Sequence, residues 1–233
     1  MANGTNHSGY QLPVGSPRGT NFRTYIVRRI KAVARHLLPA SFINEARRCQ
    51  AYDSRERALY LKIRAMNAIG IQNPRSSQPP RTAHSFLFVC FGNIMRSPMC
   101  EALMRRAVAS NPQIRVTSAG LHAIPGRIAE PRALLAAMEF GISLENHRAR
   151  LLSAEMVRET DVIFAMDYQN QVQLLSRYPE ARDKIFMLAA YADKPYRSVE
   201  IGDPYYMGED ATRSCYAILN TCIQNLASSL SDQ

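Results

Sequence analysis

The sequence lacks three features that would set it apart from ordinary globular proteins: a regular cysteine framework, a long apolar run and an apolar leader. Its five cysteines are an odd number without a repeated spacing, so they fit a reducing compartment better than a disulfide scaffold. No apolar run approaches the roughly 20 residues that span a bilayer, and residues 1–20 have no signal-peptide core. These absences predict a soluble, cytoplasmic protein.

Acidic residues are scarce in the first third of the chain. Residues 1–83 hold 14 Arg and Lys against 3 Asp and Glu, a net charge of +11, whereas residues 84–233 hold 15 against 16, a net charge of −1. The overall charge of +10 therefore belongs to the N-terminal region. The rest of the chain has the charge balance of an ordinary folded domain.

The composition divides the chain into four segments. Residues 1–20, rich in Gly, Ser, Asn and Pro, are expected to be disordered, and residues 21–70 form a basic helical extension, with one predicted helix near Ser54–Ile69. Residues 71–84 have the composition of a linker. Two hypotheses fit the extension: docking to a membrane surface or an acidic partner, or helices packed on the following domain, which we favour. No nucleic-acid-binding motif is present, so no nucleic acid is expected as a partner.

From residue 85 onward, short apolar runs alternate with helical patterns. The runs are "SFLFVC", "IRVTSA", "DVIFAM" and "KIFML", and each is followed by a helical pattern. The first, second and fourth helices are expected to begin near Pro98, Pro131 and Asp210, and the third is expected to end near Tyr178. This alternation predicts an α/β fold, a three-layer sandwich with a small four-stranded parallel sheet. Ligands bind beyond the carboxyl ends of such strands, which is where Cys90 lies.

A cysteine followed six positions later by an arginine can place a thiolate and a guanidinium on one phosphate. The spacing occurs three times, at Cys49, Cys90 and Cys100. The first, "CQAYDSR", lies between two basic helical segments, and the last, "CEALMRR", reads as continuous helix. Only Cys90 follows a buried strand and precedes a helix start, so the pair Cys90 and Arg96 is the candidate site.

The residues between this pair suit an anion-binding loop. Gly92 and Asn93 tolerate the left-handed backbone of a tight turn, which can aim successive N–H groups inward. Ser97-Pro98 then opens a helix, whose N-terminus adds unpaired N–H groups and a partial positive charge. The pattern predicts a phosphate-binding loop after the first strand.

The same surroundings predict a reactive thiol. The helix N-terminus and Arg96 should lower the pKa of Cys90 below its usual ~8.5, and Ser97 can donate a hydrogen bond to the sulfur. A lone cysteine at a strand end is more often a small buried apolar residue, but the Gly-Asn, Arg and Ser-Pro around this one favour chemistry.

The stretch "VCFGNIMRSPMCEA" resembles the phosphate-binding loop of the low-molecular-weight protein tyrosine phosphatases, V-C-x-G-N-x-C-R-S-P-x-A-E. Further motifs match in order: "SAG" at 118–120, "HRAR" at 147–150, "AMD" at 165–167 and "DPYY" at 203–206. The resemblance covers residues 85–233 and is nearest to the bacterial branch, while residues 1–83 lie outside it.

The resemblance implies a protein tyrosine phosphatase, a hydrolase that works through a phosphocysteine intermediate. It makes Cys90 the nucleophile, Arg96 the phosphate clamp and Asp203 the general acid. It implies no metal and no cofactor. The expected substrate is a phosphotyrosine protein, such as an autophosphorylating tyrosine kinase of polysaccharide export. The expected location is the cytoplasm, either free or at the membrane surface.

The resemblance also implies supporting roles. The loop is expected to be held by hydrogen bonds from Asn93, Ser118 and His147. The walls of the pocket are expected to be Phe91, Tyr205, Tyr206 and Ile124, or a neighbour of Ile124 within Leu121–Arg127. The loop itself is expected to include Gly92, Ile94, Met95 and Ser97. The motif that contains Asp167 receives no chemical role.

Departures from the pattern leave alternatives open. Met95 replaces the second loop cysteine of many relatives, so Cys90 has no adjacent resolving thiol. An arsenate reductase of the same fold needs two further cysteines, and Cys215 and Cys222 are candidates, although their spacing of seven fits one buried helix face better. Ile94 follows the tyrosine-phosphatase pattern, where the reductases have serine and the arginine phosphatases threonine. A non-catalytic phosphate-binding module is the remaining alternative.

Overall fold

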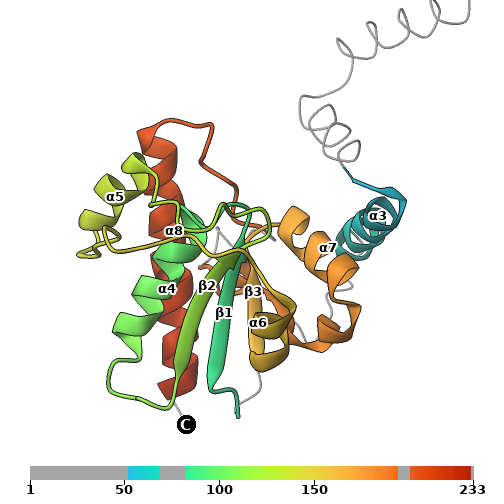
Figure 1. Ribbon diagram of the computed structural model, residues 1–233, viewed down its shortest axis with the longest axis horizontal. Helices are drawn as coiled ribbons and strands as arrows, with labels where there is room; N and C mark the ends of the chain where they lie inside the picture. The colour runs from blue at the N-terminus through green and yellow to red at the C-terminus, as the bar shows by residue number, and fades with distance from the viewer. Residues whose placement is uncertain (1–51, 69–81, 194–199, 232–233) are drawn as a thin grey trace, which may run out of the picture. The chain divides into compact units, whose positions relative to one another are not determined.

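The structure, a computed structural model, describes residues 52–68, 82–193 and 200–231 (Figure 1). The described residues all belong to one compact unit, residues 52–233. The predictions for residues 1–51, including Cys49, and for most of the linker lie outside the described residues. Each helix within the described ranges is too short or too polar to cross a membrane.

Four parallel strands form one sheet, which confirms the predicted fold class (Figure 1). They are β1 (Ser85–Cys90), β2 (Arg115–Gly120), β3 (Val162–Ala165) and β4 (Ile185–Met187), in the order β2-β1-β3-β4. The central strand β1 pairs with β2 and β3, so that Val89 lies opposite both Ala119 and Ala165. The phosphate-binding loop that the sequence predicts therefore leaves the middle of the sheet.

Helices cover both faces of the sheet, as Figure 1 shows. On one face α4 (Arg96–Ala107), α5 (Pro131–Met138) and α8 (Glu209–Ser231) pack together, and on the other lie α6 (Ala154–Glu159) and α7 (Tyr168–Arg177). The sequence did not predict α6 or the 3₁₀ segments η2 (Pro179–Lys184) and η3 (Leu188–Tyr191). These elements have six residues or fewer, too short for a helical period to emerge.

Burial explains why β1 reads as a continuous apolar run. Phe86, Phe88 and Cys90 belong to the core cluster that includes residues of α4 and α8. Leu87 and Val89 point to the opposite face and are also fully buried. A strand covered on both faces shows no polar alternation, which is the signature of a parallel sheet.

The helix predicted near Ser54–Ile69 is present as α3 (Ser54–Ala68). It belongs to the same compact unit as the sheet and lies against α7. Tyr60 is 1% exposed, so this helix contributes to a packed interior. For α3, packing on the folded domain is the arrangement observed.

Candidate functional site

The loop from Cys90 to Arg96 joins β1 to α4 and surrounds the cysteine sulfur. Cys90 ends β1 and is 3% exposed. The backbone N–H of Asn93 donates to Cys90 Sγ at 3.3 Å, and Ser97 Oγ lies 3.0 Å from the same sulfur. The sulfur therefore accepts from one backbone N–H of the loop and lies within hydrogen-bond distance of the Ser97 hydroxyl.

The structure adds two details to the sequence-based prediction of the loop. Of the two residues that tolerate a left-handed backbone, Asn93 adopts it, with a φ of +52°, and Gly92 does not. Helix α4 begins at Arg96, two residues before the predicted start near Pro98. Arg96 is therefore part of the first helical turn, where backbone N–H groups have no intrahelical partner.

Gly120 is required where β2 passes beneath the loop. A Cβ atom at this position would lie 2.8 Å from the backbone of Phe91, Gly92 and Asn93. Real Cβ atoms do not approach backbone so closely, so any larger residue would displace the loop. The "SAG" motif matched the family pattern, but nothing in its sequence revealed this close contact.

Arg96 is a fully buried cation held between two carboxylates. Its Nη1 donates to Asp167 Oδ2 at 2.6 Å and to the carbonyl of Ile201 at 2.9 Å, and its Nη2 donates to Asp203 Oδ2 at 2.5 Å. Burial alone would lower the pKa of Arg96, but the charges of Asp167, Asp203 and Cys90 outweigh it and raise that pKa. The guanidinium is therefore charged at every working pH.

The two carboxylates differ in their access to solvent. The side chain of Asp167 is 12% exposed and that of Asp203 is 40% exposed. Asp167 also caps α7, since its Oδ1 accepts a hydrogen bond from the Asn170 N–H at 2.8 Å. Sequence reasoning gave Asp167 no role; an aspartate directly before a helical pattern was the one available signal, and it indicated only a cap.

Asn93 is the centre of a hydrogen-bond network behind the loop. Its Nδ2 donates to Ser97 Oγ at 2.9 Å and to Ser118 Oγ at 2.8 Å. Its backbone carbonyl accepts from His147 Nε2 at 2.7 Å, and its Oδ1 accepts from the Arg150 N–H at 2.8 Å. Every polar group of the left-handed residue is satisfied, which stabilises its uncommon conformation.

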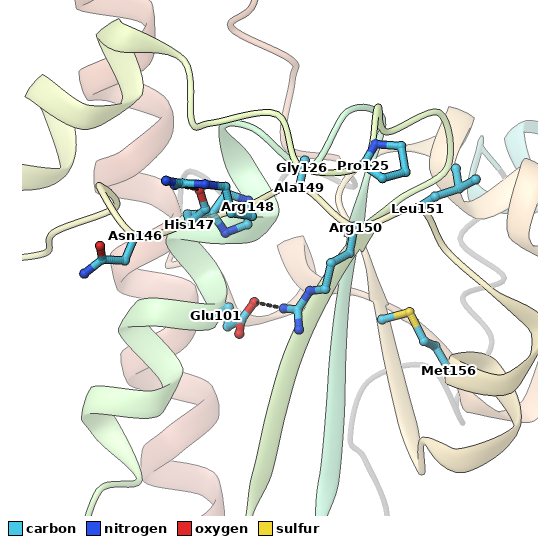
Figure 2. Close-up of a pocket in the computed structure, with 10 residues that line it drawn as sticks. All are labelled: Glu101, Pro125, Gly126, Asn146, His147, Arg148, Ala149, Arg150, Leu151 and Met156. Carbon is cyan, nitrogen blue, oxygen red and sulfur yellow. Dashed lines mark hydrogen bonds and ion pairs between the residues drawn. The ribbon is translucent and has the colours of Figure 1, made fainter.

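Two charged residues that sequence reasoning missed extend this network. Glu101 accepts hydrogen bonds from Ser118 Oγ and from Arg150 Nη2, both at 2.6 Å. Figure 2 shows the Glu101–Arg150 pair. Both residues line a pocket whose volume is about 800 Å³. The pocket is lined by Glu101, Pro125, Gly126, Asn146, His147, Arg148, Ala149, Arg150, Leu151 and Met156. It borders the network and contains neither the cysteine nor the arginine of the loop.

One aromatic ring at the loop is fixed by a histidine. Phe91 is 41% exposed and stacks on His122, with ring centroids 4.5 Å apart. His122 Nε2 lies 2.9 Å from Gln173 Oε1 and 3.1 Å from Arg177 Nη2, both on α7. Helix α7 therefore contacts the site twice, through its cap Asp167 and through this histidine.

The segment after Asp203 supplies two further rings. Tyr205 and Tyr206 meet edge to face at 4.9 Å, and Tyr206 is 94% exposed. Arg127 Nη2 donates to Tyr205 Oη at 3.3 Å, which links this segment to the Leu121–Arg127 loop. Ile124 on that loop is 64% exposed. Thus Asp203, which is bonded to Arg96, brings the tyrosines toward the phosphate-binding loop.

The other cysteines of the described residues lie in the core. Cys100, Cys215 and Cys222 are buried and form no disulfide. In the loop, Ile94 and Met95 are also buried. Burial raises the pKa of Cys100, and raises those of Cys215 and Cys222 to about 12. Such thiols are poor nucleophiles at neutral pH. Within the described ranges, no cluster of three or more His, Cys, Asp and Glu is arranged to hold a metal ion.

His147 should make stability fall at acidic pH. Burial lowers the pKa of His147 below its ordinary value, so the folded state favours the neutral ring that donates to Asn93. Its contribution is complete above about pH 6.5 and is lost as the pH falls through the lowered pKa. Urea unfolding at pH 7 and pH 5 should show that the free energy of unfolding falls less between the two pH values in His147→Gln than in wild type. The exposed His84→Gln serves as control; equal losses in all three proteins would contradict the expectation.

Asp167→Asn should destabilise the fold. Asparagine keeps the helix cap but leaves Arg96 buried with one carboxylate, and breaking a buried pair costs up to about 3–5 kcal/mol. Urea unfolding should show the loss. Asp210→Asn, at a fully exposed carboxylate on α8, should change stability by less than about 0.5 kcal/mol. Similar effects of the two variants would count against the account of Arg96.

Comparisons with known proteins agree with this geometry. The family model described as "Low molecular weight phosphotyrosine protein phosphatase" matches residues 85–233. The low molecular weight protein-tyrosine-phosphatase Etp of Escherichia coli (strain K12) is 37% identical over 148 residues, 64% of this chain and 95% of Etp.

Solved structures extend the comparison. The crystal structure of the tyrosine phosphatase Wzb from Escherichia coli K30 in complex with sulphate has a TM-score of 0.59 and 33% identity, covering 64% of this chain and 99% of Wzb. The YwlE arginine phosphatase from Geobacillus stearothermophilus has a TM-score of 0.58 and 32% identity, covering 64% of this chain and 94% of YwlE. The four-stranded fold, the loop geometry and the match over residues 85–233 show that this chain belongs to the low molecular weight phosphotyrosine protein phosphatase family.

Proposed function

We propose that this chain hydrolyses phosphotyrosine in proteins through a phosphocysteine intermediate. The observation that carries the proposal is the position of Cys90 Sγ, 3.3 Å from the Asn93 N–H donor and 3.0 Å from Ser97 Oγ, in the loop that ends at the buried cation Arg96. A dianionic phosphoryl group that enters this loop meets N–H donors, a guanidinium and a nucleophile together.

In the first step Cys90 Sγ attacks phosphorus. The S–P bond forms as the bond from phosphorus to the phenolic oxygen breaks, and Asp203 gives its proton to that oxygen. In the second step water attacks phosphorus, and the S–P bond breaks as the new P–O bond forms. Asp203 takes up a proton of the water, the Cys90 thiolate is restored and inorganic phosphate leaves. The partly exposed position of Asp203, compared with the buried Asp167, suits the carboxylate that exchanges protons with substrate and solvent.

The bond between Asp203 and Arg96 must be exchanged during this cycle. In the structure Arg96 Nη2 donates to Asp203 Oδ2 at 2.5 Å. Substrate oxygens compete for that donor through the planar fork of the guanidinium. Asp167, which bonds the other terminal nitrogen, keeps the guanidinium in place meanwhile.

Preference for an aryl ester follows from depth and from the surrounding rings. Because Cys90 is only 3% exposed, phosphorus must descend into the loop while the rest of the substrate stays outside. A phosphotyrosine ring can span that depth and lie between Phe91 and the Tyr205–Tyr206 pair, whereas phosphoserine is too short. A phosphotyrosine protein, such as an autophosphorylating kinase, is therefore the proposed partner, and a cytoplasmic location suits a reactive thiol.

Individual residues distinguish phosphotyrosine hydrolysis from phosphoarginine hydrolysis and arsenate reduction. The arginine phosphatase YwlE has a similar fold, so phosphoarginine is the second candidate substrate, although Ile94 follows the tyrosine-phosphatase pattern. Arsenate reduction would require Cys215 and Cys222 as thiols on a mobile segment. Both are buried in helix α8, which counts against that chemistry.

The test is a substrate panel of phosphotyrosine, phosphoserine and phosphoarginine peptides, with p-nitrophenyl phosphate as a reference. We expect phosphotyrosine to be cleaved fastest, Cys90→Ser to abolish turnover and Asp203→Asn to lower kcat by about 10²–10⁴-fold. Asp210→Asn and Cys215→Ser are the matched controls and should retain activity. Faster cleavage of phosphoarginine, or arsenate-dependent thiol consumption that Cys215→Ser abolishes, would replace the proposed activity with one of the alternatives.

A further inference from the structure

We propose that α3 is a positioning element of the active site and that Tyr60 acts through Tyr168 and Asp167 on Arg96. The inference rests on the proposed function, in which Arg96 holds the phosphoryl group. It assigns a role to a helix that lies before residue 85, where the match to the family model begins.

The contact between α3 and α7 is a buried aromatic cluster. Tyr60 and Tyr168 are each 1% exposed, and their rings meet edge to face with centroids 6.3 Å apart. Tyr52, 4% exposed, lies 5.2 Å from Tyr60, and the guanidinium of Arg64 lies 5.5 Å from the centre of the Tyr168 ring. Tyr168 is therefore enclosed by residues that the family domain alone would not supply.

Tyr168 is the first residue of α7 and directly follows Asp167. The cap bond from the Asn170 N–H to Asp167 Oδ1 fixes the carboxylate relative to this helical turn. The other oxygen of the same carboxylate accepts from Arg96 Nη1 at 2.6 Å. A displacement of the first turn of α7, which carries the Tyr168 ring, would therefore displace the carboxylate that holds the guanidinium.

The farther turns of α7 reach the aromatic side of the site. Gln173 and Arg177 both lie within hydrogen-bond distance of His122 Nε2, and Phe91 stacks on the His122 ring. The packing of α3 on α7 thus affects both Arg96, which is proposed to bind phosphate, and Phe91, which is proposed to contact the aryl group. Displacements of this kind are costly for catalysis even when the chemical groups are all present.

The experiment compares point variants of the full chain. Tyr60→Ala removes the ring that touches Tyr168, Tyr60→Phe keeps it, and Leu61→Ala changes an exposed neighbour on the same helix. Leu226→Ala, in the buried part of α8, supplies a variant destabilised through a different helix from α3 and α7. Each is assayed for kcat and KM with p-nitrophenyl phosphate and for inhibition by inorganic phosphate, at a temperature where circular dichroism shows it folded.

We expect Tyr60→Ala to lower kcat/KM about tenfold and to raise the Ki of phosphate, since a small misplacement can cost up to about 100-fold. Tyr60→Phe, Leu61→Ala and Leu226→Ala should keep the phosphate Ki of wild type. If Tyr60→Ala does not fold, Tyr60→Leu, which keeps apolar volume without the ring, replaces it and should show the same rise.

Equal phosphate Ki values for the Tyr60 variant and Leu61→Ala would overturn this inference while leaving the proposed function intact. A rise of the same size in Leu226→Ala would also overturn it, because general destabilisation would then explain the effect. A wild-type chain without Cys90-dependent hydrolysis would defeat the proposed function, and this inference with it.

Discussion

The site depends on one buried positive charge and the two carboxylates that hold it. A guanidinium removed from water is costly unless its donors are paired, and Arg96 is paired with Asp167, Asp203 and the carbonyl of Ile201. These partners come from the end of β3 and from the segment before α8, so the folded chain, and no local motif, creates the cation site. A charge held in this way is available to a phosphoryl group without reorganisation of the surrounding backbone.

The loop itself is maintained from two sides. Beneath it, Gly120 permits the close approach of β2, and behind it Asn93 is bonded to Ser118 and His147. In front of it the Asp203 segment and Phe91 define where a substrate can enter. The position of Cys90, the proposed nucleophile, is therefore fixed, whereas Asp203, the proposed proton donor, is the more exposed of the two carboxylates. This division suits a two-step reaction in which the leaving group and then water must reach Asp203.

Much of this could be predicted from the sequence, because the relevant signals are local. Apolar runs ending in Cys90 and a Ser-Pro helix start predicted the strand, the loop and the helix. The role of Asp167 could not be predicted, since its partner Arg96 is 71 residues away and the local pattern indicated only a cap. Glu101 was overlooked for the same reason, because its contacts with Ser118 and Arg150 are set by packing alone. The sequence showed that Gly92 and Asn93 both tolerate a positive φ, but composition does not reveal that Asn93 is the one of the two that adopts it.

The most direct test of the account is to trap the intermediate. The chain is mixed with p-nitrophenyl phosphate, quenched in acid within the first turnover, digested and analysed by mass spectrometry for phosphorylated peptides. The account predicts one phosphoryl group per active chain, on the peptide that contains Cys90, and none in Cys90→Ser. Continued turnover with no phosphoryl group on Cys90, or with the group on another residue, would contradict it.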